Sequence, residues 1–253
     1  MQKQASIVLH KYPYGESSFI LKVLTEDFGL VSLIAKGAKK PKSPFYGQFD
    51  APHLLELVYY DKAGRQLHTL GETSLIKSRS HYQNELMHSA LTLVLREIIL
   101  KSIHEGEGAH EIFELLDVSL SWSEAQEVIT PLQSYIILGR YIYRFAQIMG
   151  FGIQYENCQN CQTKLKLDRL HHLDFSEGGF LCTECQLDHI HIEIPPWLQA
   201  CWLLLKTPSS LQEEHIHLLS DVEEILIKYL WGHLHISSKI KSRDYLNQIR
   251  MMV

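Results

Sequence analysis

Two Cys-x-x-Cys pairs constrain the fold of this chain more than any other feature of its sequence. Cys158 and Cys161 form the first pair, and Cys182 and Cys185 form the second pair after twenty intervening residues. Each two-residue gap lets both thiolates of a pair face one ion, and two pairs complete the tetrahedron that zinc prefers, with Zn–S distances of about 2.3 Å. The sequence therefore predicts a structural zinc site held by these four cysteines.

Three alternatives to a site of four thiolates remain open from the residues alone, and the simplest is that the four thiols are unrelated to one another. The cysteines could form disulfides, but the chain begins without the apolar core of a signal peptide, so we expect a reducing, cytoplasmic compartment. A neighbouring histidine could instead replace a thiolate, the candidates being His171, His172, His189 and His191. Four thiolates saturate zinc and leave no position for an activated water, so we expect the ion to be structural.

The segment between the two cysteine pairs is typical of a small hairpin. Leu165, Leu167 and Leu170 are predicted to lie on one side of it, and Gly178 and Gly179 form its turn. The fifth cysteine, Cys201, lies in an apolar helical stretch, and we expect it to be a buried thiol without a metal.

Charge is distributed unevenly along the 253 residues, and this decides where a polyanion could bind. The net charge of −5 by itself argues against nucleic-acid binding. Residues 1–80, however, carry 11 lysines and arginines against 7 acidic residues, whereas residues 81–150 carry 4 against 9 and residues 151–253 carry 9 against 13. A basic module attached to an acidic body is therefore predicted, with any polyanion site at the N-terminus. No apolar run approaches the roughly 20 residues of a membrane span.

Residues 4–80 contain five short runs with the alternating pattern of half-buried strands. The predicted strands are 5–9, 17–25, 30–35, 53–60 and 65–70, with a hairpin turn at residues 61–64. Five short strands within eighty residues favour a small barrel, and the OB-fold is the commonest barrel of that size.

The densest basic stretch of the chain follows the third predicted strand, and aromatic residues come just after it. Lysines neutralise phosphates, and exposed rings such as Phe45 or Tyr46 offer surfaces on which bases stack. The alternative is a solvated loop whose aromatic residues belong to the barrel core. The candidate DNA-binding residues are Lys36, Lys39, Lys40 and Lys42 in this loop, with Lys11 and Arg65 as outlying candidates.

The pattern changes to helical periodicity after residue 80. We expect helices over 81–103, 112–120, 131–149, 196–205, 221–236 and 240–253, with Ser123 as an N-cap before the third. The third helix is rich in aromatic residues, which indicates a core helix, but its Arg140 and Arg144 could anchor the acidic tail of a partner. The fold class is therefore α+β with several domains: an OB-fold at 1–80, a helical domain at 81–152 and 194–253, and a four-cysteine zinc-binding insert at 153–193.

Motifs of catalysis are absent from the sequence. It contains no P-loop, no dinucleotide-binding glycine pattern after a strand, no Gly-x-Ser-x-Gly elbow and no His-Glu-x-x-His. With no nucleophile, base and orienting group in view, we do not expect an enzyme.

Several of these stretches together resemble the bacterial recombination mediator family RecO. The N-terminal signature of that family is similar to Tyr14–Thr25 and Ala35–Ser43, and the entry into its zinc knuckle is similar to Gly150–Cys161. Its closing helices are similar to Tyr229–His235 with Lys239–Arg243, although His235 stands where a glycine is common. The likeness covers nearly the whole chain.

The resemblance implies a DNA repair factor that is not an enzyme. Such proteins bind single- and double-stranded DNA, anneal complementary strands, and act with RecR and single-strand-binding protein to load the recombinase RecA. The acidic C-terminal tail of single-strand-binding protein is then the expected partner of Arg140 or Arg144, and the expected location is the cytoplasm, at the nucleoid. The alternative is a zinc-ribbon regulator that binds nucleic acid at one sequence.

Overall fold

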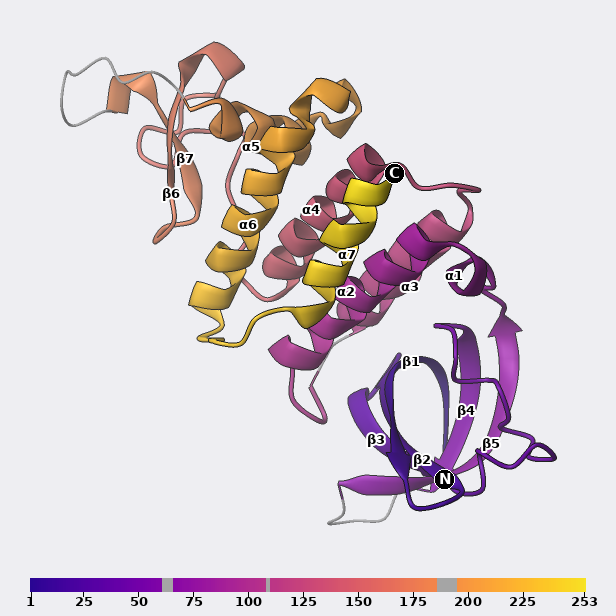
Figure 1. The fold of residues 1–253 in the computed structure, drawn as a ribbon. Coiled ribbons are helices and arrows are strands. Elements are labelled where there is room, and N and C mark those ends of the chain that lie inside the picture. The colour runs from indigo at the N-terminus through magenta and orange to yellow at the C-terminus, as the bar shows by residue number, and fades with distance from the viewer. Residues whose placement is uncertain (61–65, 108–109, 186–194) are drawn as a thin grey trace. The chain divides into compact units, whose positions relative to one another are not determined.

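The computed structural model describes residues 1–60, 66–107, 110–185 and 195–253 of the chain (Figure 1). The chain forms two compact units. The first unit comprises Met1–Ile129 together with Ser238–Val253, and the second comprises Thr130–Ser237. The C-terminal segment therefore returns to the unit in which the chain began.

A closed five-stranded barrel forms the N-terminal part of the first unit. Its strands are β1 (Gln2–Tyr14), β2 (Ser18–Thr25), β3 (Gly29–Ala35), β4 (Leu54–Tyr60) and β5 (Leu67–Lys77). Their order around the barrel is β1-β2-β3-β5-β4, with β3 and β5 parallel and the other neighbours antiparallel. The predicted barrel is confirmed, with β1 and β5 longer than predicted, and the predicted turn at 61–64 lies outside the described residues.

Alternation along β1 places its apolar residues in two different environments. Val8 belongs to the core inside the barrel, whereas its neighbours Ile7 and Leu9 are buried on the opposite face. Helix α2 (Leu86–Ser102) contacts β1, and Arg96 donates a hydrogen bond to the carbonyl oxygen of Val8 (3.4 Å). The outer face of β1 is therefore covered, which explains why four consecutive residues of this strand, Ser6 to Leu9, are buried.

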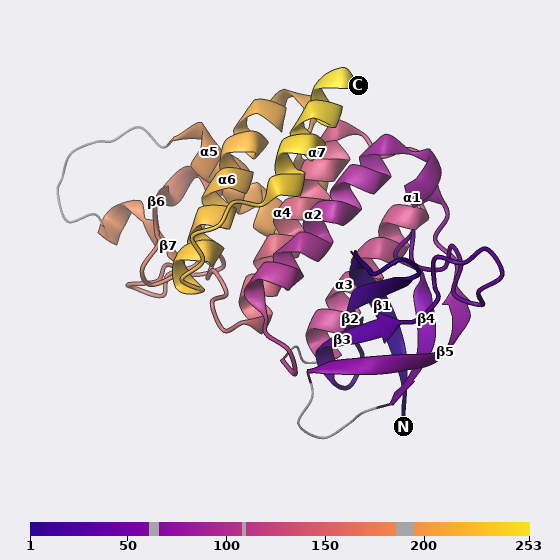
Figure 2. The same ribbon diagram turned by 60° about the horizontal axis from the view of Figure 1, so that its bottom comes forward.

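The helices of the first unit are α1 (His81–Asn84), α2, α3 (His110–Glu124) and the C-terminal α7 (Lys241–Met252). Helix α7 lies alongside α2, as Figures 1 and 2 both show. The carboxylate of Glu97 in α2 accepts hydrogen bonds from the backbone N–H groups of Lys241 (3.0 Å) and Ser242 (2.8 Å). Because the first N–H groups of a helix have no partner within it, this carboxylate caps α7 and fixes its start against α2.

The continuous helix predicted from His81 to Ile103 is wrong in one respect, because the structure interrupts it. Glu85 has an extended backbone (φ −116°, ψ 121°) and separates α1 from α2. Helix α1 is held by α3 instead: Glu124 accepts a hydrogen bond from the backbone N–H of Ser80 (2.8 Å), and the Tyr82 hydroxyl donates to a backbone carbonyl of α3 (2.7 Å). These long-range hydrogen bonds outweigh the local periodicity on which the prediction rested.

The second unit combines a small hairpin with three packed helices. The hairpin strands are β6 (Leu170–Asp174) and β7 (Gly179–Cys182), and the helices are α4 (Pro131–Ile148), α5 (Pro196–Lys206) and α6 (Ile216–His233). Short 3-10 turns occupy Leu167–Arg169, Thr183–Cys185, Pro208–Ser210 and Glu213–His215. The aromatic residues of α4 are buried, which confirms that it is a core helix. Gly139 lets α5 approach closely, since a Cβ there would lie 2.5 Å from a methyl group of Leu204.

The N-cap of α4 is Thr130, which confirms the predicted start of this helix at residue 131, whereas the prediction of Ser123 as an N-cap is wrong. The Thr130 hydroxyl accepts a hydrogen bond from the backbone N–H of Gln133 (3.2 Å), and the Gln133 side chain accepts one from the Thr130 N–H (2.9 Å). Ser123 is buried inside α3. Ser123 also has a glutamine three residues later, but only Thr130 is followed by a proline at the first helical position and then by an apolar periodic run.

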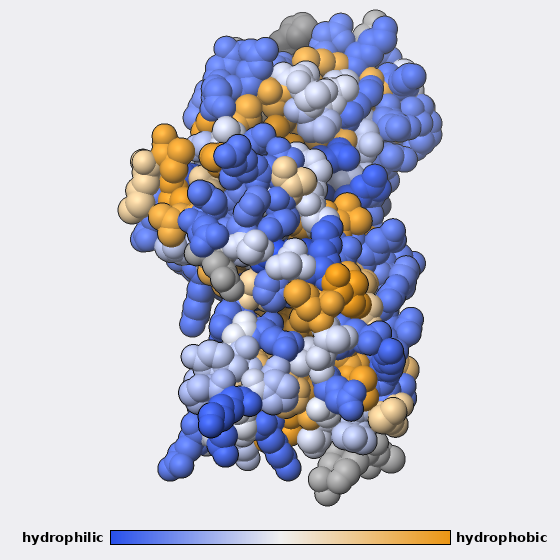
Figure 3. Space-filling view, turned by 90° about the vertical axis from the view of Figure 1, so that its right-hand side faces the viewer, coloured by the Kyte–Doolittle hydropathy of each residue, from blue (hydrophilic) through white to orange (hydrophobic). Residues whose placement is uncertain are grey.

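No helix in the described part of the chain is long and apolar enough to cross a membrane. On the face shown in Figure 3, hydrophobic residues form small patches that are separated by hydrophilic ones. The structure therefore offers two places for a functional site on which sequence and geometry agree: the cysteine cluster of the second unit and the basic loop of the barrel.

Candidate metal centre and candidate nucleic-acid interface

The first cysteine pair lies on a tight loop in the second unit. The backbone N–H of Cys158 donates to the carbonyl oxygen of Thr163 (2.8 Å), and that of Gln162 donates to the carbonyl oxygen of Cys158 (2.9 Å). Gln162 has a left-handed backbone (φ 60°), which closes the loop behind Cys161. These hydrogen bonds fix the loop locally, so the two sulfurs of the pair face the same side.

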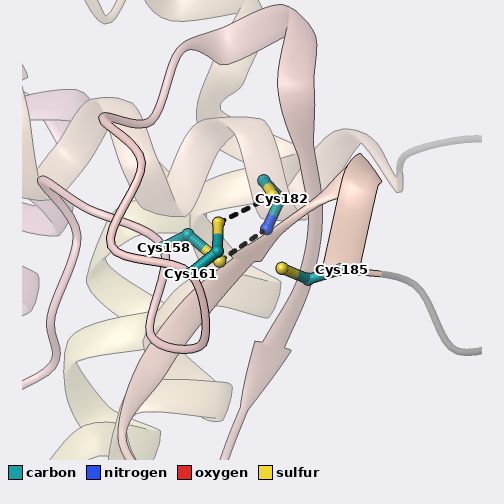
Figure 4. A group of neighbouring side chains, drawn as sticks. All are labelled: Cys158, Cys161, Cys182 and Cys185. Atoms are coloured by element: carbon teal, nitrogen blue, oxygen red, sulfur yellow. Dashed lines mark hydrogen bonds between the residues drawn. The ribbon is translucent and has the colours of Figure 1, made fainter.

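The second pair follows directly from the hairpin. Cys182 is the last residue of β7, and Cys185 ends the 3-10 turn after it. Figure 4 shows the four cysteine side chains gathered between this turn and the loop of the first pair. The hairpin brings the second pair to the first because the backbone N–H of Gln159 donates to the carbonyl oxygen of Phe180 in β7 (2.9 Å).

The spacing of the four sulfurs fits a tetrahedral zinc ion. All four lie within 4.8 Å of one another, and the sulfurs of Cys161 and Cys182 are 3.7 Å apart. A tetrahedron with Zn–S bonds of about 2.3 Å has edges of about 3.8 Å. The backbone N–H of Cys182 also donates to the sulfur of Cys158 (3.4 Å), a contact that stabilises a thiolate. These residues therefore fit a metal centre with four thiolate ligands.

The protein surroundings make the four thiols unequal acids. Hydrogen bonds with Thr163 lower the pKa of Cys161 to about 6, whereas the hydrogen bond with Cys161 raises the pKa of Cys185 to about 12. Burial raises the pKa of Cys182; it also opposes ionisation of Cys158, but backbone N–H groups outweigh it and lower that pKa. The first pair thus provides the more acidic thiols, and a dication at the centre would favour the thiolate form of all four.

Apolar side chains support the cysteine cluster. Of the three leucines predicted to line one side of the hairpin, Leu165 and Leu170 are buried, whereas Leu167 is only half-buried in a 3-10 turn. Leu165, Leu170, Leu173 and Phe180 are all buried. The indole N–H of Trp202 in α5 donates to a backbone carbonyl in the chain leading to the first pair (3.0 Å). The cluster is therefore part of the fold of the second unit, and four thiolates leave no coordination position for a substrate or an activated water. Cys201 is fully buried apart from this cluster, as predicted.

Histidine ligands have no support in the described part of the chain. The residues described there contain one group of side chains with the spacing of a metal site, and that group is the four cysteines. His172 is exposed on β6 and is not part of it. His189 and His191, as well as the side chain of His171, lie outside what the structure describes.

The basic loop of the barrel runs between β3 and β4. Its inner side is anchored in the barrel core by Ala38, Phe45 and Phe49, which are all buried. Its backbone is tied to the start of β2, because the N–H of Lys39 donates to the carbonyl oxygen of Ser17 (2.9 Å). The loop is therefore anchored to the barrel, and its remaining side chains point outwards.

The lysines proposed for DNA differ in how far they are free to contact phosphate. Lys36, Lys40 and Lys42 are exposed, and within the described residues their ammonium groups have no hydrogen-bond or ion-pair partner. Lys39 instead donates to the carbonyl oxygen of Gly15 (2.8 Å), and Lys11 forms an ion pair with Asp50. Arg65 lies outside the described residues. Three lysines of one loop thus form the accessible part of the candidate interface.

The two aromatic candidates for base stacking have opposite environments. Phe45 is 8% exposed and belongs to the barrel core, so the interpretation of Phe45 as a stacking surface is wrong. Tyr46, the next residue, is 59% exposed. Adjacent residues point to opposite sides of the anchored loop, and Tyr46 is the ring that a base can reach.

Arg140 and Arg144 are one helical turn apart on α4 but are engaged differently. Arg140 donates to the carbonyl oxygens of Leu205 (2.6 Å) and Leu204 (3.4 Å), at the C-terminal end of α5. Arg144 is exposed and donates to the side chain of Gln147 (3.0 Å). Arg140 therefore links α4 to the end of α5, and Arg144 is the more accessible of the two arginines.

One charged group near the basic loop escaped the sequence reasoning. Asp50 lies beside Lys11, although 39 positions separate them, and both line the same small hollow on the barrel. Neither periodicity nor a local motif points to this pair, since it depends on how the loop closes onto β1.

Comparison with known proteins shows that the chain matches two related protein-family descriptions. The chain matches the families described as "Recombination protein O N terminal" over residues 1–79 and "Recombination protein O C terminal" over residues 83–193. The second match includes all four clustered cysteines. Three relatives that carry the name "DNA repair protein RecO" come from Clostridium kluyveri, a Thermoanaerobacter species and Prosthecochloris aestuarii.

The similarity to these relatives is low in identity, and for two of the three it extends over most of both chains. The Clostridium kluyveri protein is 27% identical over 237 residues, which cover 90% of this chain and 85% of that protein. The Thermoanaerobacter protein is 25% identical over 258 residues, which cover 99% and 98%. The Prosthecochloris aestuarii protein is 28% identical over 158 residues, which cover 62% and 58%.

Proposed function

This chain belongs to the RecO family of DNA repair proteins, and on that premise we propose that it binds single- and double-stranded DNA through its barrel and mediates homologous recombination. The observation that carries the proposal is the exposure of Lys36, Lys40 and Lys42 on one anchored loop of that barrel. Contacts of lysine with phosphate are independent of sequence, which suits a protein that must act wherever DNA is damaged.

Strand annealing is the activity that this arrangement supports best. Annealing makes and breaks no covalent bond, so it needs no catalytic group; it needs a surface that neutralises the phosphates of two strands while their bases pair. The proposed role of the metal centre is structural: it holds the hairpin of the second unit through Cys158, Cys161, Cys182 and Cys185. Zinc is the ion that a set of four thiolates prefers.

Partners follow from the family. We propose that the protein acts with RecR and with single-strand-binding protein to load RecA onto covered single strands, in the cytoplasm at the nucleoid. The acidic tail of single-strand-binding protein is proposed to dock on α4, with Arg144 pairing a carboxylate. Arg140 contributes indirectly, since it is committed to the end of α5.

The experiment that tests the proposal is annealing of two complementary oligonucleotides, one of them fluorescently labelled, with and without single-strand-binding protein. The expected result is acceleration by the wild-type protein at low salt, for several unrelated sequences. A variant with Lys36, Lys40 and Lys42 all replaced by alanine should lose most of the acceleration. Binding to a single sequence without annealing would instead indicate a zinc-ribbon regulator and would contradict the proposal.

A further inference from the structure

A small hollow opens on the barrel beside the basic loop. Its lining combines the charged side chains of Lys11, Lys39 and Asp50 with the rings of Phe19 and Tyr46. Its volume is about 230 Å³. Sites for drug-sized ligands measure roughly 300–1,000 Å³, so this hollow suits a single planar ring system.

The rings that line the hollow are not equally available to a ligand. The ammonium groups of Lys11 and Lys39 lie 5.0 and 5.3 Å from the centroid of the Phe19 ring, within the distance of about 6 Å typical of a cation–π contact. These cations occupy the face of Phe19. Tyr46, which is largely exposed, is therefore the ring on which a base can stack.

The presence of Asp50 is unexpected on a surface that binds only phosphates, because both groups are negatively charged. Its carboxylate would repel them, yet it lines the same hollow as the two lysines and the exposed tyrosine. One of its oxygens accepts from Lys11, and among the described residues no second donor reaches Asp50. A carboxylate has lone pairs on both oxygens, so the other oxygen keeps its capacity to accept a hydrogen bond.

We infer that this hollow binds one unstacked nucleobase of a single strand, with the base stacked on Tyr46 and its exocyclic amino group donating to Asp50. The inference rests on the proposed function and names the ligand of the same surface. Acidic side chains accept hydrogen bonds from the N4 amino group of cytosine, whereas a carbonyl oxygen at that position is repelled. The hollow therefore favours cytosine and adenine over bases that carry a carbonyl group there, and it favours single strands because both faces of a base are covered in a duplex.

The test compares oligonucleotides that differ only in that group. Homopolymers of dC and dU form one matched pair and homopolymers of dA and dI form the other, because an amino group replaces a carbonyl oxygen in each. Fluorescence anisotropy at one salt concentration should give wild-type affinities about fivefold higher for dC and dA, at the lower end of what one base contact contributes.

Substitutions then separate the hydrogen bond from charge and from stacking. In Asp50→Asn the preference within each pair should disappear, because the amide can turn its oxygen toward an amino group or its NH2 group toward a carbonyl oxygen. The matched control Asp27→Asn, which removes an equal charge from an exposed position outside the hollow, should keep the preference. Tyr46→Leu should weaken binding of all four probes.

The possible results distinguish the inference from the proposed function. Equal affinities within each pair, or a preference that persists in Asp50→Asn, would overturn the inference and leave DNA binding intact. Unchanged affinities in Tyr46→Leu would overturn its stacking step. Failure of the wild-type protein to bind any of the four probes would overturn the proposed function together with the inference.

Discussion

The buried guanidinium of Arg79 donates a hydrogen bond to the carboxylate of Asp117 in helix α3. Arg79 is 0% exposed and also donates to the carbonyl oxygen of Pro52 (2.8 Å) and to the hydroxyl of Ser121 (3.2 Å). A guanidinium presents several donors in a fixed plane, so one side chain can join several segments. This arginine ties the chain on either side of the β4–β5 hairpin to α3.

Removal of Arg79 should destabilise the first unit more than removal of any exposed lysine. In Arg79→Met the carboxylate of Asp117 and the Pro52 carbonyl lose their donor, and we expect the free energy of unfolding to fall by about 3 kcal/mol. Urea unfolding followed by tryptophan fluorescence or circular dichroism measures this change. Lys77→Met is the control, because Lys77 is exposed and makes one hydrogen bond to Ser121. Similar losses in the two variants would contradict the assignment.

Glu97 should make the docking of α7 depend on pH. Burial opposes its ionisation, but hydrogen bonds from Ser242 and Lys241 outweigh burial and lower its pKa below the ordinary 4.5. A lowered pKa stabilises the fold above the unfolded value, and that stabilisation is lost as the pH falls through the folded value. Glu97→Gln should therefore reduce stability at pH 7 by about 1 kcal/mol, the value of a helix cap.

The pH profile gives the decisive measurement for Glu97. The difference in Tm between the wild type and Glu97→Gln should be full at pH 7, should begin to close below pH 4.5, and should vanish below the lower folded-state pKa, where the wild-type carboxyl group is also neutral. Glu114→Gln, at an exposed position of α3, should show no such convergence. A difference that stays constant from about pH 7 to about pH 3.5 would mean that Glu97 does not act as a charged cap.

One zinc ion per chain is the expected metal content. Protein purified without chelator should contain about one equivalent, and Cys158→Ser should lose it and lower the Tm sharply, because the binding free energy of a structural metal is folding free energy. Cys201→Ala, which removes a buried thiol outside the cluster, should keep the metal. Wild-type protein with well under one equivalent would refute the zinc assignment.

The parts of this fold that could be predicted from the sequence are those that depend on nearby residues. The pairing of Cys158 with Cys161 needs only a two-residue gap, and the barrel strands follow from alternation. The break at Glu85 could not be predicted in this way, because Ser80 and Tyr82, on its N-terminal side, donate hydrogen bonds to the distant helix α3. A local pattern carries no information about which distant segment competes for a residue.

The candidate interface also combines features that the local sequence predicts with features that depend on distant segments. The lysine-rich loop is visible as a run of sequence, but Phe45 and Tyr46 are adjacent in a loop without a period, so their opposite burial could not be predicted. The commitment of Lys11 to Asp50 also stays hidden until the loop is closed. The net charge of residues 1–80 therefore overstates the number of positive side chains that are free to bind DNA.

If an acidic tail docks on α4, substitutions of Arg140 and Arg144 should have different effects. Arg140→Ala removes the donor to two carbonyls at the end of α5, so we expect the free energy of unfolding to fall by about 1–2 kcal/mol. Arg144→Ala should leave stability unchanged but weaken binding of an acidic peptide with an aromatic C-terminal residue, measured by anisotropy. Binding of naked DNA is the control and should be unaffected. Peptide affinity that survives Arg144→Ala would place the tail elsewhere.

The salt dependence of DNA binding provides the sharpest test of the basic loop. Each phosphate contact removed should flatten the slope of log affinity against log salt by about 0.7 for single strands. Lys40 and Lys42 are exposed without partners in the described structure, so Lys40→Ala/Lys42→Ala should reduce the slope by about 1.4. Lys3→Ala/Lys228→Ala is the matched control, since it removes the same charge from lysines that are paired with Glu56 and Glu224. A change that depends on contact with phosphate appears only in the first variant, whereas a change that depends on net charge appears in both. Equal slopes in all three proteins would mean that the loop is solvated and does not bind DNA.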